Sequence, residues 1–156
     1  MNFEHLIAIN DPANPLLVPL TRRQLWLGLV ERVDNPQLFL PGIAACRLLE
    51  RSPDSALREL DFGAARIRDR VTLIAEESVH FAIEPGEQHA GGSLTIRIEE
   101  PEADRLFLRF SYVTGFGNQA GSEDAAYVEY VKSAYHQSDL DCVRIIRTLA
   151  AEGSRQ

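Results

Sequence analysis

The best candidate for acid–base chemistry in this sequence is a carboxylate set in an apolar row. Asp69 alternates with Ile67, Val71 and Leu73, so in a β-strand these four side chains would share one face. If that face points inward, burial would raise the pKa of the Asp69 carboxyl and suit it to proton transfer. We favour the alternative that Asp69 pairs with an arginine, Arg58 on the preceding strand being the candidate, or that a bulge turns it outward.

A histidine has a similar position near the N-terminus. His5 is in line with Phe3, Ile7 and Ile9, and an imidazole beside Asp69 would complete an acid–base pair. A lone histidine in an apolar row is more often a hydrogen-bonded core residue, and spacing alone cannot bring the two together. The other histidines carry less information: His80 alternates outward, His89 falls in a loop, and His136 falls on a polar helix face.

Most other kinds of site lack a motif. No H-E-x-x-H, H-x-H or paired cysteines bring metal ligands together, and Cys46 and Cys142 lie far apart, so we expect reduced cysteines, no metal and no cofactor. Residues 115–121 resemble a dinucleotide-binding loop between a strand and a helix. Their G-x-G-x-x-x-G spacing is one residue too long, and no strand follows the helix to complete a β-α-β unit.

Composition points to one soluble domain spanning residues 1–156. Of the 156 residues 45% are hydrophobic and 25% charged, and 16 basic against 23 acidic residues give a net charge of −7. This balance opposes binding to nucleic acid or anionic lipid surfaces. No apolar run approaches the ~18 residues of a membrane span. The first residues lack the basic and apolar regions of a signal peptide, so we expect a cytoplasmic protein.

The chain begins with a predicted strand and a helix. Phe3–Ile9 alternates and stops at the turn-forming residues 10–15. Thr21 and Gln24 then form a capping box that starts a helix ending at Asn35–Pro36, with residues 37–40 adding up to one further turn. The apolar stripe of this helix consists of Leu25, Trp26, Leu29, Val30 and Val33.

The middle of the chain changes to a period of two, which is typical of consecutive antiparallel strands. With the first strand this gives about seven. The six further runs are Ile43–Glu50, Ala56–Phe62, Arg66–Ile74, Val79–Ile83, Ser93–Glu99 and Leu106–Val113. Arg66, Arg68 and Arg70 alternate onto one strand face, where a solvated stripe paired with Glu59 or Asp61 is the plain expectation.

The last element is a long one-sided helix over residues 122–150. The face that we expect to point inward carries Tyr127, Val131, Ala134, Tyr135, Ser138, Cys142, Ile145, Ile146 and Leu149. The opposite face carries Glu129, Lys132, His136, Arg144 and Arg147. Such a helix must lie on another layer of the molecule.

The widths of the two layers do not match. Seven strands at ~4.8 Å spacing make a sheet about 34 Å wide, whereas a helix is only ~10–12 Å across. We therefore predict an α+β fold in which a curved seven-stranded antiparallel sheet wraps around the C-terminal helix, with one or two short helices after the first strand closing one end. Small residues at Ala134, Ser138 and Cys142 favour a cavity, although they would equally let helix and sheet approach closely.

A cavity between sheet and helix would bind a hydrophobic or aromatic small molecule. Tyrosine hydroxyls at Tyr112, Tyr127 and Tyr135 could orient it, but core packing is the competing interpretation for these aromatic positions. The candidate lining residues are Trp26, Asp69, Val71, Phe81, Ile96, Phe110, Tyr112, Tyr127, Val131, Tyr135, Ser138 and Cys142.

The order of elements resembles the helix-grip fold of the START-related, birch-pollen-allergen-like superfamily (SRPBCC). More narrowly, the chain is similar to the AtaL-like branch of bacteria and fungi over nearly its whole length. The similar segments are residues 3–5, 9–12, 25–29, 58–63, 69–71 and 91–94. The resemblance implies a deep apolar cavity, used by different members for lipids, sterols, polyketides or aromatic compounds and sometimes for cyclase chemistry. It supplies no catalytic signature.

Three functions remain open. The first is a module that binds a lipid-like or polyketide-like small molecule. The second is a cyclase or dehydratase that uses Asp69 and His5 for proton transfer in the same cavity. The third is a protein-interaction domain or homodimer that uses an exposed apolar patch at Leu38-Phe39-Leu40.

Overall fold

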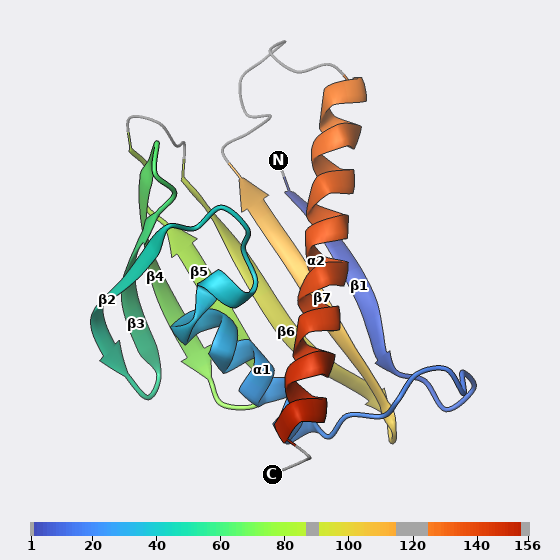
Figure 1. The fold of residues 1–156 in the computed structure, drawn as a ribbon. Coiled ribbons are helices and arrows are strands. Elements are labelled where there is room, and N and C mark those ends of the chain that lie inside the picture. The colour runs from blue at the N-terminus through green and yellow to red at the C-terminus, as the bar shows by residue number, and fades with distance from the viewer. Residues whose placement is uncertain (1, 87–90, 115–124, 154–156) are drawn as a thin grey trace.

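The computed structural model describes residues 2–86, 91–114 and 125–153, the side chains of 125–128 excepted. These described residues form seven strands, two α-helices and one 3-10 helix (Figure 1). They are β1 (Asn2–Asn10), α1 (Arg22–Asp34), η1 (Pro36–Leu38), β2 (Ala45–Ser52), β3 (Ser55–Asp61), β4 (Arg66–Ile74), β5 (Ser78–Ile83), β6 (Gly92–Glu102), β7 (Arg105–Thr114) and α2 (Ala125–Gly153). The fold class predicted from the sequence is confirmed.

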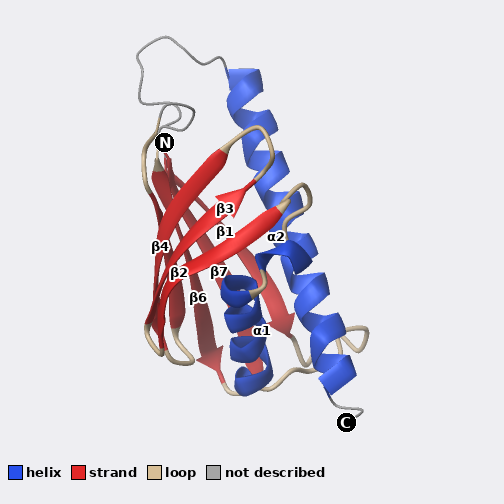
Figure 2. Ribbon diagram, turned by 60° about the vertical axis from the view of Figure 1, so that its left-hand side comes forward, coloured by secondary structure: helices blue, strands red, loops and turns tan. Residues whose placement is uncertain are grey.

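All seven strands form one antiparallel sheet in the order β1-β7-β6-β5-β4-β3-β2. The sheet curves, and both helices lie on its concave side (Figure 2). Register shifts occur in β1, β2 and β6, but the pairing of β4 with β3 and β5 runs without a break. The alternation in β4 therefore holds, and Asp69 faces inward with Val71 and Leu73, each 4% exposed or less.

Helix α1 begins where its own sequence dictates. The Thr21 side chain accepts a hydrogen bond from the Gln24 backbone N–H (3.0 Å), and the Gln24 side chain accepts one from the Thr21 N–H (2.9 Å). This capping box satisfies two amides that the first turn leaves without partners. Leu25, Leu29 and Val33 are 0% exposed, so the helix fills the concave face at the lower end of the sheet.

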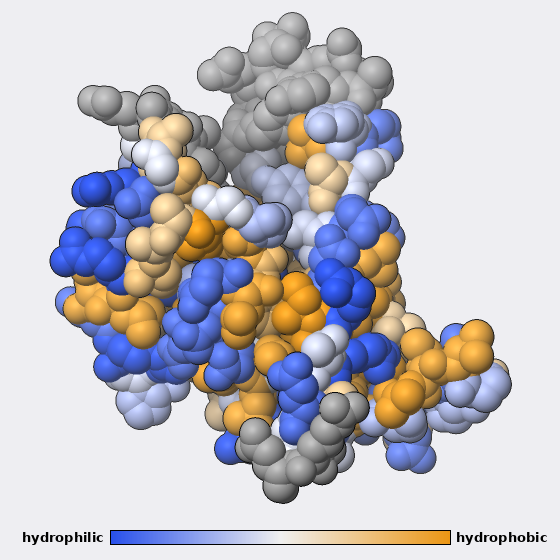
Figure 3. Space-filling model, viewed as in Figure 1, coloured by the Kyte–Doolittle hydropathy of each residue, from blue (hydrophilic) through white to orange (hydrophobic). Residues whose placement is uncertain are grey.

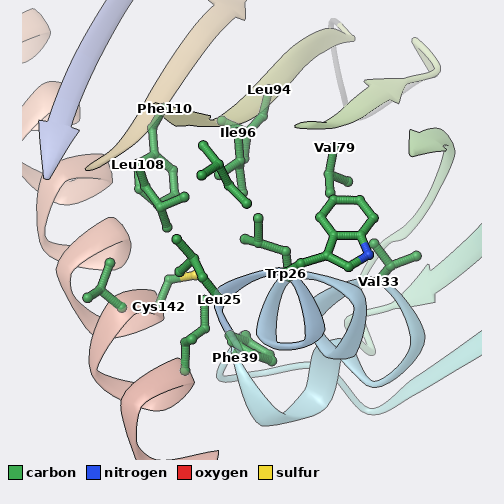
Figure 4. Close-up of a cluster of buried hydrophobic side chains, with 14 of the residues drawn as sticks. Leu25, Trp26, Val33, Phe39, Val79, Leu94, Ile96, Leu108, Phe110 and Cys142 are labelled. Carbon is green, nitrogen blue, oxygen red and sulfur yellow. The ribbon is translucent and has the colours of Figure 1, made fainter. Parts of the chain in front are cut away.

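The upper end of the molecule is the end at which β7 finishes and α2 begins, at the top of Figure 1. At the lower end, α1 packs between the sheet and α2. Figure 4 shows its Leu25, Trp26 and Val33 among side chains from the sheet and Cys142 from α2. Gly28 permits this close approach, because a Cβ atom there would lie 2.5 Å from Ile146 Cγ2.

Burial along the inward face of α2 changes from one end to the other. Cys142 and Ile146, next to α1, are each 1% exposed. Val131, Tyr135 and Ser138, one to three turns nearer the upper end, are only partly buried. The helix packs tightly where α1 supports it and loosely above.

The orientation of α2 about its axis differs from the sequence-based expectation. Ala134 is exposed, so its predicted inward position is wrong. Asp139 and Val143 are buried instead. The physical reason is that Asp139 has a hydrogen-bond partner on β7, so a polar residue outside the predicted apolar stripe turns inward.

Candidate functional site

Both oxygens of Asp69 are held by one arginine on the neighbouring strand. Arg58 Nε donates to Oδ1 at 2.9 Å and Nη2 donates to Oδ2 at 2.6 Å, and each residue is 2% exposed. Arg58 Nη1 also donates to the backbone oxygens of Val33 (2.9 Å) and Arg32 (3.3 Å) at the end of α1. The expected pairing of Asp69 with an arginine is confirmed. The same arginine links the end of α1 to the sheet.

His5 and Asp69 do not form a pair. His5 lies on β1 and Asp69 on β4, with β7, β6 and β5 between these strands. The His5 ring instead lies 4.9 Å from the His136 ring and 6.1 Å from the Tyr112 ring. Burial, followed by the charges of His136 and Lys132, lowers the pKa of His5, which favours a neutral imidazole near pH 7.

Aromatic rings gather between the upper ends of β1, β7 and α2. Phe3 stacks on Tyr112 at 5.1 Å between ring centroids, and Tyr135 lies 4.4 Å from Tyr112 and 5.5 Å from Phe3. We call Phe3, His5, Tyr112, Tyr135 and His136 the aromatic cluster. Such a surface packs well against planar, apolar molecules.

A buried carboxyl lies directly below this cluster. Asp139 is 0% exposed, and Tyr112 donates its hydroxyl hydrogen to Oδ1 at 2.5 Å. Oδ2 is also buried and has no hydrogen-bond partner among the described residues. Burial raises the pKa of Asp139 to about 7, although the Tyr112 hydrogen bond and the Arg32 charge oppose the shift. Burial also raises the pKa of Tyr112, so its phenol stays protonated.

An arginine from α1 completes the arrangement. Arg32 is 8% exposed, and its guanidinium lies 5.7 Å from the centre of the Phe81 ring. Its charge opposes the effect of burial on the pKa of both Cys142 and Asp139. Burial raises the pKa of Cys142, which makes it a poor nucleophile. We call Arg32, Tyr112, Asp139 and Cys142 the Asp139 cluster. A carboxyl that titrates near neutrality beside a phenol donor can exchange protons with a bound molecule.

Sequence reasoning missed Asp139 and Arg32, although helical spacing contained a signal for one of them. Asp139 follows Tyr135 by four residues and precedes Cys142 by three, so it shares their face. It was not selected because a charged residue in a helix usually faces water. Nothing comparable distinguishes Arg32 from the other arginines of α1.

The other sequence-predicted lining residues divide into two groups. Trp26, Val71, Phe81, Ile96 and Phe110 are at most 6% exposed and belong to the hydrophobic core, together with the buried Tyr112 and Cys142. Val131, Tyr135 and Ser138 are partly buried on α2. The side chain of Tyr127 lies outside the described residues.

Two surface predictions have different outcomes. The arginine stripe on β4 is confirmed for Arg66 and Arg68, which lie 3.8 and 3.5 Å from carboxylates on β3. Arg70 differs from the prediction, since it lies 3.6 Å from Glu50 on β2. The exposed patch at residues 38–40 is wrong for Phe39, which is 5% exposed and belongs to the core. Leu38 is 47% exposed, while Leu40 packs against the core. The short η1 helix turns Phe39 inward.

Grooves lined by described residues lie away from the Asp139 cluster. One of about 560 Å³ runs between α1 and α2 past Leu27, Ile146 and Leu149, and one of about 320 Å³ lies under residues 16–20. Figure 3 shows hydrophobic atoms on the projecting loop between β1 and α1, where Leu16 is 88% exposed. A hollow of about 520 Å³ lies at the lower end of the molecule, and charged residues such as Asp11, Arg22 and Glu100 help to line it. An interior cavity at the upper end stays a prediction.

Within the described ranges, no cluster of three or more histidine, cysteine, aspartate or glutamate side chains is arranged to hold a metal ion. Both cysteines are free. Neither α1 nor α2, as far as the structure describes them, has the length and apolar character needed to cross a bilayer.

The chain is similar to one protein family in sequence and to several solved structures in fold. A family model described as AtaL, acetylaranotin biosynthesis cluster protein L, matches residues 7–153. No curated protein matches the sequence. Among solved structures, the Zhui aromatase/cyclase from Streptomyces sp. R1128 aligns with a TM-score of 0.61 at 16% identity, covering 97% of this chain and 93% of that one.

Two further structures show the same fold. The di-domain ARO/CYC StfQ from the steffimycin biosynthetic pathway aligns with a TM-score of 0.67 at 13% identity, covering 99% of this chain but only 52% of StfQ, so this chain corresponds to about half of that protein. Ara h 8.0201 aligns with a TM-score of 0.62 at 12% identity, covering 97% of this chain and 98% of that one. At such identities the likeness establishes the helix-grip fold.

Proposed function

The chain belongs to the AtaL family, and we propose that it binds a hydrophobic or aromatic small molecule between the upper end of the sheet and α2. The observation that carries this proposal is the change in burial along one face of α2. Cys142 and Ile146 are 1% exposed, whereas Val131 and Tyr135 on the same face are only partly buried. An inward face that its own fold leaves loosely covered is a surface for a ligand.

The residues at that surface have the composition of a small-molecule site. Phe3 and Tyr135 offer aromatic faces, while Asp139 and Tyr112 place a few polar atoms at the base. Mostly apolar walls with few polar groups fix the orientation of a ligand without a high desolvation cost. The similarity in fold to Zhui and StfQ, both described as aromatase/cyclases, supports a polyketide-like aromatic compound.

A direct test uses the neutral fluorescent probe N-phenyl-1-naphthylamine. We expect binding with enhanced fluorescence, weakened about tenfold by Tyr135→Ala because one aromatic wall is lost. Tyr130→Ala is the matched control, since Tyr130 lies on the same helix and is 70% exposed. Equal effects of the two substitutions would place the probe elsewhere, and absence of binding to the wild-type protein would overturn the proposal.

A second candidate, a cyclase or dehydratase, is favoured by one observation. Asp139 has a pKa of about 7 and a free Oδ2, so it can take a proton from an activated methylene and return it to a departing hydroxyl group. Asp69 is committed to Arg58 and does not fit this task. If cyclisation of a poly-β-ketone is found, Asp139→Asn must abolish it; unchanged turnover would exclude this mechanism.

A further inference from the structure

The buried charged side chains do not all have a direct partner. Four charged side chains are buried among the described residues: Arg32, Arg58, Asp69 and Asp139. Arg58 and Asp69 form a two-point ion pair. Arg32 and Asp139 remain, and they influence each other's charge without an ion pair between them among the described contacts. Each must be stabilised by something else, because a buried isolated charge is costly.

Asp139 is only half satisfied as a hydrogen-bonding group. Tyr112 supplies a donor to Oδ1, whereas Oδ2 is buried without a partner. A buried polar atom without a partner costs ~1–3 kcal/mol and marks a position where a water molecule or ligand atom completes the structure. The protonated carboxyl would donate a hydrogen bond from Oδ2, and the carboxylate would accept one there.

The choice of ligand follows from the charge of Arg32. A guanidinium is always protonated and binds oxyanions with two parallel hydrogen bonds. When Asp139 is protonated, Arg32 has no negative partner among the buried residues other than Asp69, which Arg58 occupies. An anionic ligand oxygen would then neutralise Arg32 and accept a hydrogen bond from the protonated Oδ2.

We propose that the bound molecule carries an acidic oxygen, such as that of a carboxylic acid, enol or phenol, and that this oxygen lies as an anion between the Arg32 guanidinium and the Asp139 carboxyl. The inference rests on the proposed small-molecule function and adds the chemical class of the ligand. Above neutral pH, binding takes up one proton from solvent, because Asp139 must be protonated in the complex.

Three groups packed near Asp139 stay neutral in the relevant range. From β7 and α2, the pKa values of Tyr112, Tyr135 and Cys142 are all raised by burial, so these groups stay neutral between about pH 6 and 8. The pKa of His5, which contacts Tyr112, is lowered. His136 and Lys132 lie near His5 and could also affect the pH dependence of binding. The Asp139→Asn variant separates the effect of Asp139 from theirs.

The test compares 2-naphthoate with its neutral isostere 2-naphthamide by titration calorimetry. The acid is ionised throughout pH 6–8. With the pKa of Asp139 near 7, we expect the acid to bind about tenfold more tightly at pH 6 than at pH 8, because the protonated fraction falls by that factor. Binding of the amide should not change with pH.

Three variants assign the effect to residues. Asp139→Asn should make acid binding independent of pH, since the amide side chain is permanently neutral. Arg32→Gln should weaken binding of the acid about tenfold and change the affinity for 2-naphthamide by less than about twofold. Arg32→Lys keeps the positive charge, so it should retain the preference for the acid. Arg144→Gln is the control, because Arg144 is exposed on α2.

The outcomes separate the two proposals. Equal affinity for acid and amide at both pH values, or a pH dependence that survives Asp139→Asn, overturns the acidic-oxygen subsite while small-molecule binding stands. Failure of both naphthalene compounds and of N-phenyl-1-naphthylamine to bind overturns the proposed function and this inference together.

Discussion

Removing the Asp69 carboxylate should make the protein much easier to unfold, because this carboxylate neutralises the buried Arg58 guanidinium. The two side chains are 3% exposed and share hydrogen bonds of 2.6 and 2.9 Å. Deleting one member of such a pair leaves an uncompensated buried charge, which costs about 3–5 kcal/mol. We expect Asp69→Asn to lower the free energy of unfolding by most of this amount, since the neutral amide can accept only one of the two Arg58 hydrogen bonds.

Urea unfolding measures this loss, followed by the fluorescence of the single tryptophan, Trp26. Arg68→Gln is the matched control. Arg68 belongs to the same strand, lies 3.5 Å from Glu59 and is 47% exposed, so its loss should cost less than about 1 kcal/mol. A cost below about 1 kcal/mol for Asp69→Asn would refute the structural role of the pair.

A double variant tests the coupling itself. Arg58→Met with Asp69→Leu removes both charges, so it should be less destabilising than the sum of the single changes. It will not restore full stability, because Arg58 also donates to the Val33 carbonyl at the end of α1. Additive effects would mean that the two side chains act independently.

Three further changes test the site and its support. Because burial raises the pKa of Asp139 from 3.8 to about 7, the folded state binds more protons than the unfolded state between these pH values. The free energy of unfolding should therefore fall by up to ~1.4 kcal/mol per pH unit as pH rises toward 7. Urea unfolding of Asp139→Asn should show a weaker dependence of this free energy on pH. Tyr112→Phe removes a hydrogen bond that lowers the Asp139 pKa, so carboxyl NMR should find that pKa higher; an unchanged value would contradict the contact. Gly28→Ala should cost about 1–3 kcal/mol in thermal unfolding because its Cβ would meet Ile146, whereas Gly86→Ala, which meets nothing within 4 Å, should be nearly neutral.

Local interactions made much of the fold predictable from sequence. The capping box of Thr21 and Gln24 starts α1 through hydrogen bonds between residues three apart. Strict alternation put Asp69 on one strand face with Val71 and Leu73, and uninterrupted pairing on both sides of β4 keeps the three together on the buried face. Even Arg58 could be named as its partner, because antiparallel neighbours place the two residues directly opposite each other.

The candidate site depended on contacts that no local pattern contains. Asp139 faces inward and Ala134 outward because of how α2 is rotated about its axis, and the partner that fixes this rotation, Tyr112, is 27 residues away on β7. His5 and Asp69 had equally suitable sequence patterns, yet sheet order places three strands between them. The sequence by itself determined which residues alternate, where α1 starts and that a wide sheet needs a helix in its curve. Only the tertiary structure decided which carboxyl lacks an ion-pair partner. The pKa of Asp139 is set by desolvation, by the hydrogen bond from Tyr112 on β7 and by the charge of Arg32 on α1, whereas the same fold pairs Asp69 with Arg58.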